Sequence, residues 1–182
     1  MDNHYIFVLL LVPLCLICGC STPDGGDASG GINVVSDLNT PKYSYETAME
    51  DLDYLVDEGV LSDTNMTVHQ INGAGVDING TATSWILGIR QDGDEVLLTY
   101  GTDGWGVNSW DGPFPEDEIV LETLMTPTVL YEKQRVYIQD MMNQTNVSHT
   151  DIMVTEKTYI ITFTSNIDVS KLRFNATTGE LI

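Results

Sequence analysis

Three cysteines lie within six positions near the start of the chain, and the sequence has no others. Cys15, Cys18 and Cys20 belong to the stretch LCLICGCS, residues 14–21. Thiols at this spacing could form a disulfide, bind a metal ion or carry a covalent group. A zinc site would need ligands in polar turns and partners elsewhere in the chain. Because two of the three cysteines sit in an apolar run and none follows Cys20, the disulfide and metal alternatives are disfavoured.

The apolar run itself, residues 5–18, predicts export from the cell. Its fourteen residues are too few to span a bilayer, which takes about 20, and fit the core of a secretory signal, about 7–15. The run ends at Gly19-Cys20 and a flexible polar stretch follows. This order resembles a lipoprotein signal with residues 17–20 as the lipobox. The resemblance implies cleavage after residue 19 and a lipid on Cys20; an uncleaved anchor and a plain secreted form are the alternatives.

The charge of the chain limits its partners. Asp and Glu number 27 against seven Lys and Arg, for a net charge of −20. Removing residues 1–19 takes away one charged residue, Asp2, and leaves −19. Such a surface repels nucleic acid and anionic headgroups, so we expect no nucleic-acid partner and membrane attachment through the lipid alone. Disorder is not expected past residue 40, because 42% of the chain is apolar and those residues are periodic.

Asparagine sequons give a second indication of an exported protein. Five match N-x-S/T, a modest excess over chance: Asn65, Asn79, Asn143, Asn146 and Asn175. The motif predicts glycosylated surface positions in an exported protein. Acidity, sequons and signal together predict an extracytoplasmic protein on a prokaryotic, and specifically archaeal, cell surface.

Familiar catalytic patterns are missing from the sequence. Its histidines, His4, His69 and His149, have no metal-binding spacing, and there is no G-x-S-x-G and no glycine-rich nucleotide loop. Pairs of acids are frequent, as composition alone would give. We therefore expect no catalytic residue, no metal and no cofactor.

The aromatic and acidic stretch 102–118 is the best candidate site. It is predicted to be a loop, and it contains Trp105, Trp110 and Phe114 among five acids. Exposed aromatics often anchor interfaces, which suggests a glycan or a protein as ligand. The alternative is that either tryptophan covers the core beneath a long loop. Calcium is less suited, because the acids lack EF-hand spacing.

The elements that would position this loop can be read from periodicity. Residues 20–41 are predicted to be a flexible tether. Residues 43–59 have apolar positions three and four apart, which predicts an amphipathic helix with Ser44 as N-cap and Gly59 at its end. The period then becomes two. It predicts a weak strand over 66–78, interrupted by glycines, and stronger strands over 84–90 and 95–101 around a turn at 91–94.

A second helix and further strands follow. Thr126 as N-cap and Pro127 as first residue predict a helix that continues to about Gln144. Its buried candidates are Leu130, Val136, Tyr137, Ile138, Met141 and Met142. Strands are expected over 151–156, 157–164 and 170–177.

The two halves of the chain, 42–118 and 119–182, have similar patterns. Trp85-Ile86 matches Tyr159-Ile160 and Leu97 matches Leu172. A helix followed by antiparallel strands, repeated twice, predicts an α+β fold with both halves packed into one domain.

The ending LRFNATTGELI, preceded by a helix and by the strand 159–163, resembles a PepSY domain. The resemblance covers residues 127–182 well and 43–104 more loosely. It implies an extracytoplasmic module that modulates peptidases or other envelope partners, and it carries no catalytic residues. The sequence therefore predicts a lipid-anchored, non-catalytic binding module. The alternatives are a surface hydrolase acting on glycan or peptide and a structural envelope component.

Overall fold

The computed structural model describes residues 40–59, 61, 66–110, 112–113, 115–155 and 157–182, all within one compact unit, residues 37–182. Cys20, Asn65 and Phe114 lie outside the described residues. The elements in order are α1 (Tyr45–Asp57), β1 (Met66–Val76), β2 (Ser84–Gln91), β3 (Asp94–Gly101), β4 (Gly104–Ser109), the 3-10 turn η1 (Leu121–Thr123), α2 (Pro127–Lys133), α3 (Arg135–Thr145), β5 (Thr150–Thr155), β6 (Thr158–Thr164) and β7 (Val169–Asn175).

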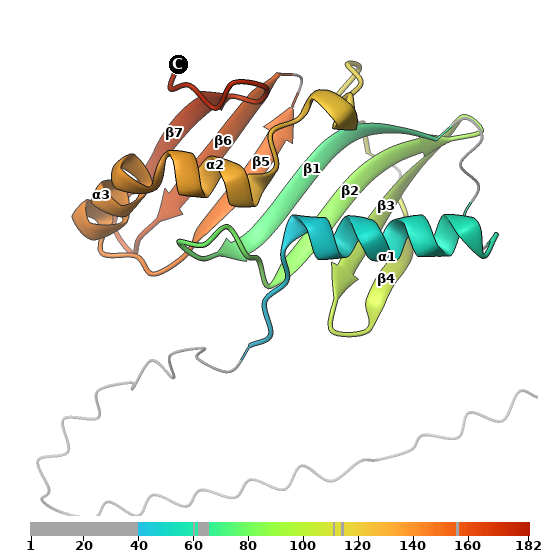
Figure 1. The fold of residues 1–182 in the computed structure, drawn as a ribbon, viewed down its shortest axis with the longest axis horizontal. Helices are drawn as coiled ribbons and strands as arrows, with labels where there is room; N and C mark the ends of the chain where they lie inside the picture. Colours follow the sequence, from blue (N-terminus) through green and yellow to red (C-terminus); the bar gives the residue numbers. More distant parts are fainter. Residues whose placement is uncertain (1–39, 60, 62–65, 111, 114, 156) are drawn as a thin grey trace, which may run out of the picture. The chain divides into compact units, whose positions relative to one another are not determined.

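Within the described residues, the strands form one seven-stranded sheet in the order β4-β3-β2-β1-β5-β6-β7. Each neighbouring pair is antiparallel. All three α-helices lie on the same face of this sheet (Figure 1). The predicted α+β fold is confirmed.

Two helix-plus-strand halves join at the centre of the sheet, where β1 pairs with β5. Each half contains the same hydrogen bond. Trp85 Nε1 donates to the carbonyl of Tyr43, and the Tyr159 hydroxyl donates to the carbonyl of Met125. Tyr43 and Met125 each stand two residues before the first residue of a helix. The two halves are therefore alike in structure as well as in sequence pattern. In each half, an aromatic residue on the second strand donates a hydrogen bond to the segment just before the helix.

One expected match between the halves is wrong by a single residue. Leu172 pairs with Ile161 beneath the helices. The equivalent pair in the first half is Leu98 with Leu87. Leu97 points to the other side of the sheet, because successive strand residues alternate between faces.

The first helix is confirmed, with its predicted ends. Ser44 Oγ accepts a hydrogen bond from the Thr47 backbone N–H at 3.0 Å, and Gly59 adopts a φ of +70° just past the last turn. Tyr45, Ala48 and Leu52 are buried against the sheet. The predicted apolar stripe thus packs on the core.

The single helix predicted from Thr126 to Gln144 is wrong, because the chain breaks at Gln134 into α2 and α3. The nearly buried Gln134 side chain donates to the carbonyl of Gly179 at 2.6 Å. This bond ties the break to the C-terminal turn. After the break Ile138 and Met142 are buried, whereas Val136 and Tyr137 are 78% and 58% exposed, contrary to expectation.

The weak strand expected over 66–78 is the central strand of the sheet. It is also the longest described, at 11 residues. Gly73 does not interrupt the strand, because its missing side chain leaves room for Trp85 and Ile152, which would lie 2.5 and 2.8 Å from an added Cβ. Gly75, with a φ of +59°, lies where the β1–β5 register shifts. Gly73 therefore makes room for core side chains, and Gly75 adopts the positive φ found at the register shift.

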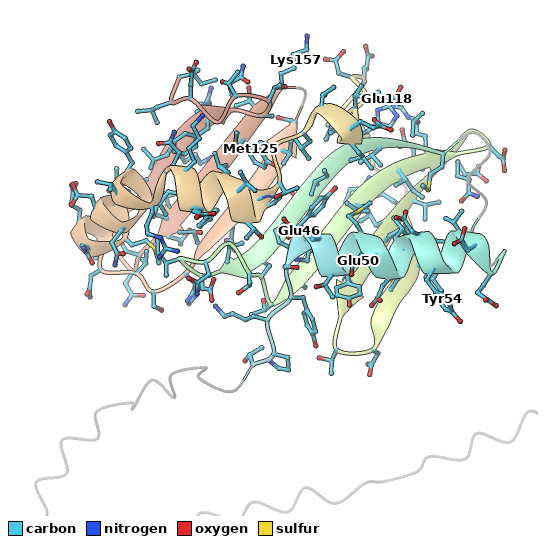
Figure 2. The ribbon with its side chains drawn as sticks, in the orientation of Figure 1. Glu46, Glu50, Tyr54, Glu118, Met125 and Lys157 are labelled. Atoms are coloured by element: carbon cyan, nitrogen blue, oxygen red, sulfur yellow. The ribbon has the colours of Figure 1, made fainter. Side chains whose placement is uncertain are left out.

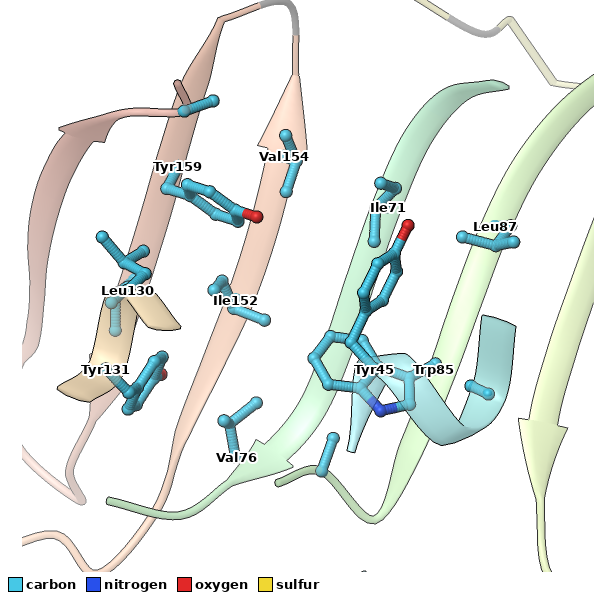
Figure 3. Close-up of a cluster of buried hydrophobic side chains, with 14 of the residues drawn as sticks. Tyr45, Ile71, Val76, Trp85, Leu87, Leu130, Tyr131, Ile152, Val154 and Tyr159 are labelled. Atoms are coloured by element: carbon cyan, nitrogen blue, oxygen red, sulfur yellow. The ribbon is translucent and has the colours of Figure 1, made fainter. Parts of the chain in front are cut away.

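The core lies between the sheet and the helices (Figure 3). Its first half centres on Trp85. The Trp85 and Tyr45 rings pack edge to face, with their centroids 5.5 Å apart. Its second half centres on Tyr159 and Tyr131. Ile71 and Ile152, from the two central strands, are both buried and join the halves into one cluster.

Candidate functional site

The predicted loop 102–118 is in part a strand, and this places Trp105 against the core. β4 pairs with β3 across a turn that ends at Gly104, where φ is +80°. Trp105 is half-buried beneath α1, and its Nε1 donates to the carbonyl of Ala48 at 2.7 Å. Its ring lies 5.1 Å from that of Tyr100. Trp105 thus fastens α1 to the edge of the sheet.

Trp110 lies beyond the end of β4 and remains 43% exposed. Its indole ring lies over Gly112, where an added Cβ would come within 2.6 Å of the ring. The structure therefore separates the two tryptophans: one packs under a helix and the other offers a surface. Phe114, the third aromatic residue predicted for this site, is outside the described part.

The described sequons lie in turns and at element ends. Asn79 is exposed in the turn after β1, and Asn143 and Asn146 are exposed at the end of α3. Asn175 ends β7, and its Oδ1 accepts from the backbone N–H groups of Thr177 and Thr178 at 2.9 and 2.8 Å. The Asn175 amide is thus already part of a turn, whereas the other three are more accessible.

Neither histidine in the described part is arranged as a catalytic base. His69 is buried; Nε2 lies 2.9 Å from the Thr67 hydroxyl and Nδ1 lies 3.2 Å from the carbonyl of Asp117. Both ring nitrogens thus have structural partners. His149 is exposed, with Nδ1 at 3.1 Å from the Ser148 hydroxyl. In the part of the chain that is described, no group of His, Cys, Asp and Glu is placed to hold a metal ion.

Glu46 is a charged group at the junction of the two halves. It lies in the first turn of α1, on the side toward Met125 and α2 (Figure 2), and accepts from the Thr128 hydroxyl at 2.9 Å. Burial alone would raise the pKa of its carboxyl. Stabilisation of the carboxylate by the Thr126 hydroxyl, its own backbone N–H and the Thr128 and Ser44 hydroxyls outweighs burial and lowers that pKa. The buried Thr126 hydroxyl lies beside this group without a hydrogen bond of ordinary geometry. A carboxyl held ionised in this way joins helices and is poorly suited to donate protons.

A row of side chains crosses the face of the sheet opposite the helices, and we name it the apolar row after its three apolar members, Ile86, Met153 and Ile160. Adjacent strands place Thr99, Ile86, Asn72, Met153, Ile160 and Arg173 side by side across six strands. Leu97 belongs to the same face on β3. We name this surface the helix-free face. No described helix covers it (Figure 1).

The charge of the helix-free face differs from that of the whole chain. Its charged strand residues are Arg90, Glu95, Asp151, Lys171 and Arg173. Glu95 pairs with Arg90 at 3.0 Å, and Asp151 Oδ1 accepts from the Gly75 backbone N–H at 3.0 Å. Both acids are thus engaged. The three basic and two acidic strand residues of this face thus sum to one positive charge, on a chain of net charge −20.

A shallow hollow of about 280 Å³ lies on this face at the join of the two halves. Asn72, Ala74 and Met153 line it, with Asp151 and Thr162 beside them. It occurs where the β1–β5 register shifts after Gly73, because a shift leaves the ladder locally open. The hollow could accept one apolar side chain of a ligand.

Sequence reasoning missed this surface, although a signal for it was present. The stretches SWILGIR and TYIITFT have apolar residues at consecutive positions. Consecutive apolar residues in a strand indicate that both of its faces carry apolar side chains. Ile86 and Ile160 are the second-face residues of these strands.

Comparison with known proteins gives little further information. No protein-family model matches the chain, and no curated protein matches it. Among solved structures, the chain is similar to the crystal structure of a candidate lipoprotein from Clostridium difficile 630. The identity is 11% and the TM-score 0.45, over 74% of this chain and 88% of that one. A likeness of this degree is weak. The PepSY-like and archaeal interpretations stay predictions.

None of the described helices is long and apolar enough to cross a membrane.

Proposed function

We propose that this chain is an extracytoplasmic protein, anchored to the membrane by a lipid on Cys20, that binds a partner without catalysing a reaction. The observation that carries the binding proposal is the apolar row on the helix-free face. Ile86, Leu97, Met153 and Ile160 are only partly buried there. The outer face of a one-sided antiparallel sheet is ordinarily polar. Aliphatic side chains with a polar rim have the anatomy of a protein interface.

The repeated halves fit the same proposal. Two PepSY-like units, each with a helix on one side of three or four strands, would together present one continuous sheet surface. Their shared hydrogen bonds from Trp85 and Tyr159 to the helix starts support a common origin of the two units. We propose that the pair acts as a modulatory module for a peptidase or another envelope partner.

The anchor can be tested by changing two neighbouring cysteines separately. Cys20→Ser is expected to abolish lipid attachment and to remove most of the protein from the detergent phase of a phase separation. Cys18→Ser is the matched control and should leave both unchanged, because only the residue after the cleavage site carries the lipid. Mass spectrometry of the native N-terminus should find a lipidated Cys20.

Other results would contradict the anchor. A native protein that begins at Met1 would show an uncleaved signal helix. A cleaved N-terminus without lipid would show a plain secreted form.

The binding surface can be tested by photo-crosslinking in the cells that make the protein. A photoreactive residue at Ile160 is expected to give a discrete adduct, and Met153→Asp should reduce its yield at least tenfold. The same residue at Val136, exposed on α3, is the matched control and should give no such adduct. A third probe at Trp110 tests the aromatic segment predicted as the site.

Adducts from Val136 with none from Ile160 would contradict the helix-free face. Adducts from Trp110 alone would locate binding at the end of β4 instead.

A further inference from the structure

We propose that the helix-free face binds a protein segment in which apolar side chains are followed by carboxylates, with the carboxylates meeting Lys171 and Arg173. This inference rests on the function proposed for that face and adds the chemistry of the partner. Two observations support it: the order of the residues along the apolar row, and the two cations beside that row, Lys171 and Arg173.

The row sets the spacing of the partner's groups. Ile86 lies on β2, Met153 on β5 and Ile160 on β6, with β1 between the first two. Neighbouring strands are about 4.8 Å apart, so the stretch from Ile86 to Ile160, with the polar Asn72 within it, extends roughly 14 Å. Arg173 is the next residue of the row, directly opposite Ile160, about 5 Å further on. A matching segment therefore carries its acid close to one end of its apolar contacts.

The hollow supplies a position for one apolar anchor. Met153 and Thr162 line it together with Asn72. Thr162 pairs with Lys171 on β7. An apolar side chain in the hollow, at β5, would thus lie two strands from Lys171, whereas Ile160 and Arg173 are on adjacent strands.

The charges favour carboxylates at this edge. Lys171 and Arg173 are exposed and point the same way from β7. In the described part of the chain, neither side chain makes an ion pair or a hydrogen bond, and both acids of the face are already engaged. A guanidinium matches a carboxylate through two parallel hydrogen bonds. A basic or neutral partner would leave these cations uncompensated at the contact.

The rest of the molecule would direct such a partner to this face. With 27 acids in the chain, most other surfaces repel an anionic segment. Repulsion elsewhere gives specificity as effectively as attraction at the site. At about 0.15 M salt the Debye length is about 8 Å, so distant acids are screened while contacts with Lys171 and Arg173 persist.

The test uses a random peptide library displayed on phage and selected on the full-length protein in detergent at about 0.15 M salt. Selected peptides are then measured on three variants. Lys171→Glu with Arg173→Glu reverses the cations of the helix-free face. Lys133→Glu with Arg135→Glu, on the helical side, is the matched control with the same change of charge. Met153→Asp disrupts the apolar row.

Selected peptides are expected to combine aliphatic or aromatic residues with Asp or Glu. Their affinity should fall at least tenfold on the Lys171 and Arg173 double variant and on Met153→Asp. It should change less than twofold on the Lys133 and Arg135 control. Thermal unfolding of each variant shows whether a loss of binding reflects a loss of fold.

The opposing outcomes separate the inference from the function on which it rests. Neutral or basic peptides that respond only to Met153→Asp would overturn the carboxylate chemistry and leave the binding face in place. Peptides indifferent to all three variants would overturn both. Failure to enrich any peptide would overturn the inference. Dimers of the full-length protein in sedimentation, abolished by Met153→Asp, would make a second copy the occupant and overturn it as well.

Discussion

Gly73→Ala is expected to destabilise the protein by about 3 kcal/mol, at the upper end of the cost of overpacking a core. An added Cβ would lie 2.5 Å from the Trp85 ring and 2.8 Å from Ile152. Neither neighbour can move easily. Trp85 is fully buried and held by its 3.0 Å hydrogen bond to Tyr43, and Ile152 lies on the paired strand. Urea denaturation of variant and parent measures the loss.

Gly106→Ala is the matched control for this substitution. Gly106 also lies within a strand, but an added Cβ would meet only the Thr99 carbonyl at an ordinary 3.8 Å. Replacing a strand glycine that has open space restricts the unfolded chain, so we expect a change within about 1 kcal/mol, of stabilising sign. Equal losses for the two variants would show that Gly73 is not required for the packing of Trp85.

Alkaline pH is expected to unfold the protein steeply. Burial raises the pKa of Tyr45, Tyr131 and Tyr159 well above the ordinary value, and neighbouring charges add to this. The folded state therefore favours the protonated hydroxyls. Their stabilisation is complete below about pH 10, the unfolded value, and is lost as pH rises above it. Each tyrosine removes roughly 1.4 kcal/mol per pH unit, or about 4 kcal/mol for the three.

Tyrosinate absorbance and near-ultraviolet circular dichroism followed together test this expectation. The buried tyrosines should ionise in the same step in which tertiary structure is lost. Tyr100, whose pKa is raised to about 12 by burial and then by its hydrogen bond to Asp51, should ionise in the same range. Ionisation of all tyrosines near pH 10 with the fold intact would contradict the burial of these hydroxyls.

Two conservative variants separate the tyrosines. Tyr45→Phe removes a buried hydroxyl that makes no hydrogen bond within the described residues, so stability at neutral pH should stay the same or rise by about 1 kcal/mol. Tyr159→Phe removes the donor to the carbonyl of Met125 and should cost about 1–2 kcal/mol. Each substitution should reduce the loss of stability at alkaline pH by the contribution of one tyrosine, roughly 1.4 kcal/mol per pH unit.

Elements with strong local signals were predicted well. Ser44 and Gly59 delimit α1 because capping and positive φ act within a few residues. Asp92-Gly93 forms the predicted turn between β2 and β3, with φ values of 52° and 95°. Such signals need no distant partner, so a single sequence contains them.

Elements whose conformation depends on distant residues were missed or misread. Gln134 breaks the second helix through a bond to Gly179, 45 residues away. Gly73 belongs in a strand because Trp85 needs its space. Trp105 lies in a strand and not in the predicted loop, because its strand pairs with β3. Its indole nitrogen also donates to a carbonyl of α1. None of these partners is apparent from periodicity.

By itself, the sequence determined the α+β class, the first helix and the β2–β3 hairpin. It also showed that Trp85 and Tyr159 occupy equivalent positions in the two halves. It predicts, without a structural test so far, the lipid on Cys20. Only the tertiary structure decided which face of each strand the helices cover. That choice left Ile86, Met153 and Ile160 partly buried in one row on the opposite face, and it is the reason why we propose that face, and not the aromatic segment, as the binding site. The physical reason is that alternation shows which residues share a face, whereas burial of that face depends on packing between segments far apart in the chain.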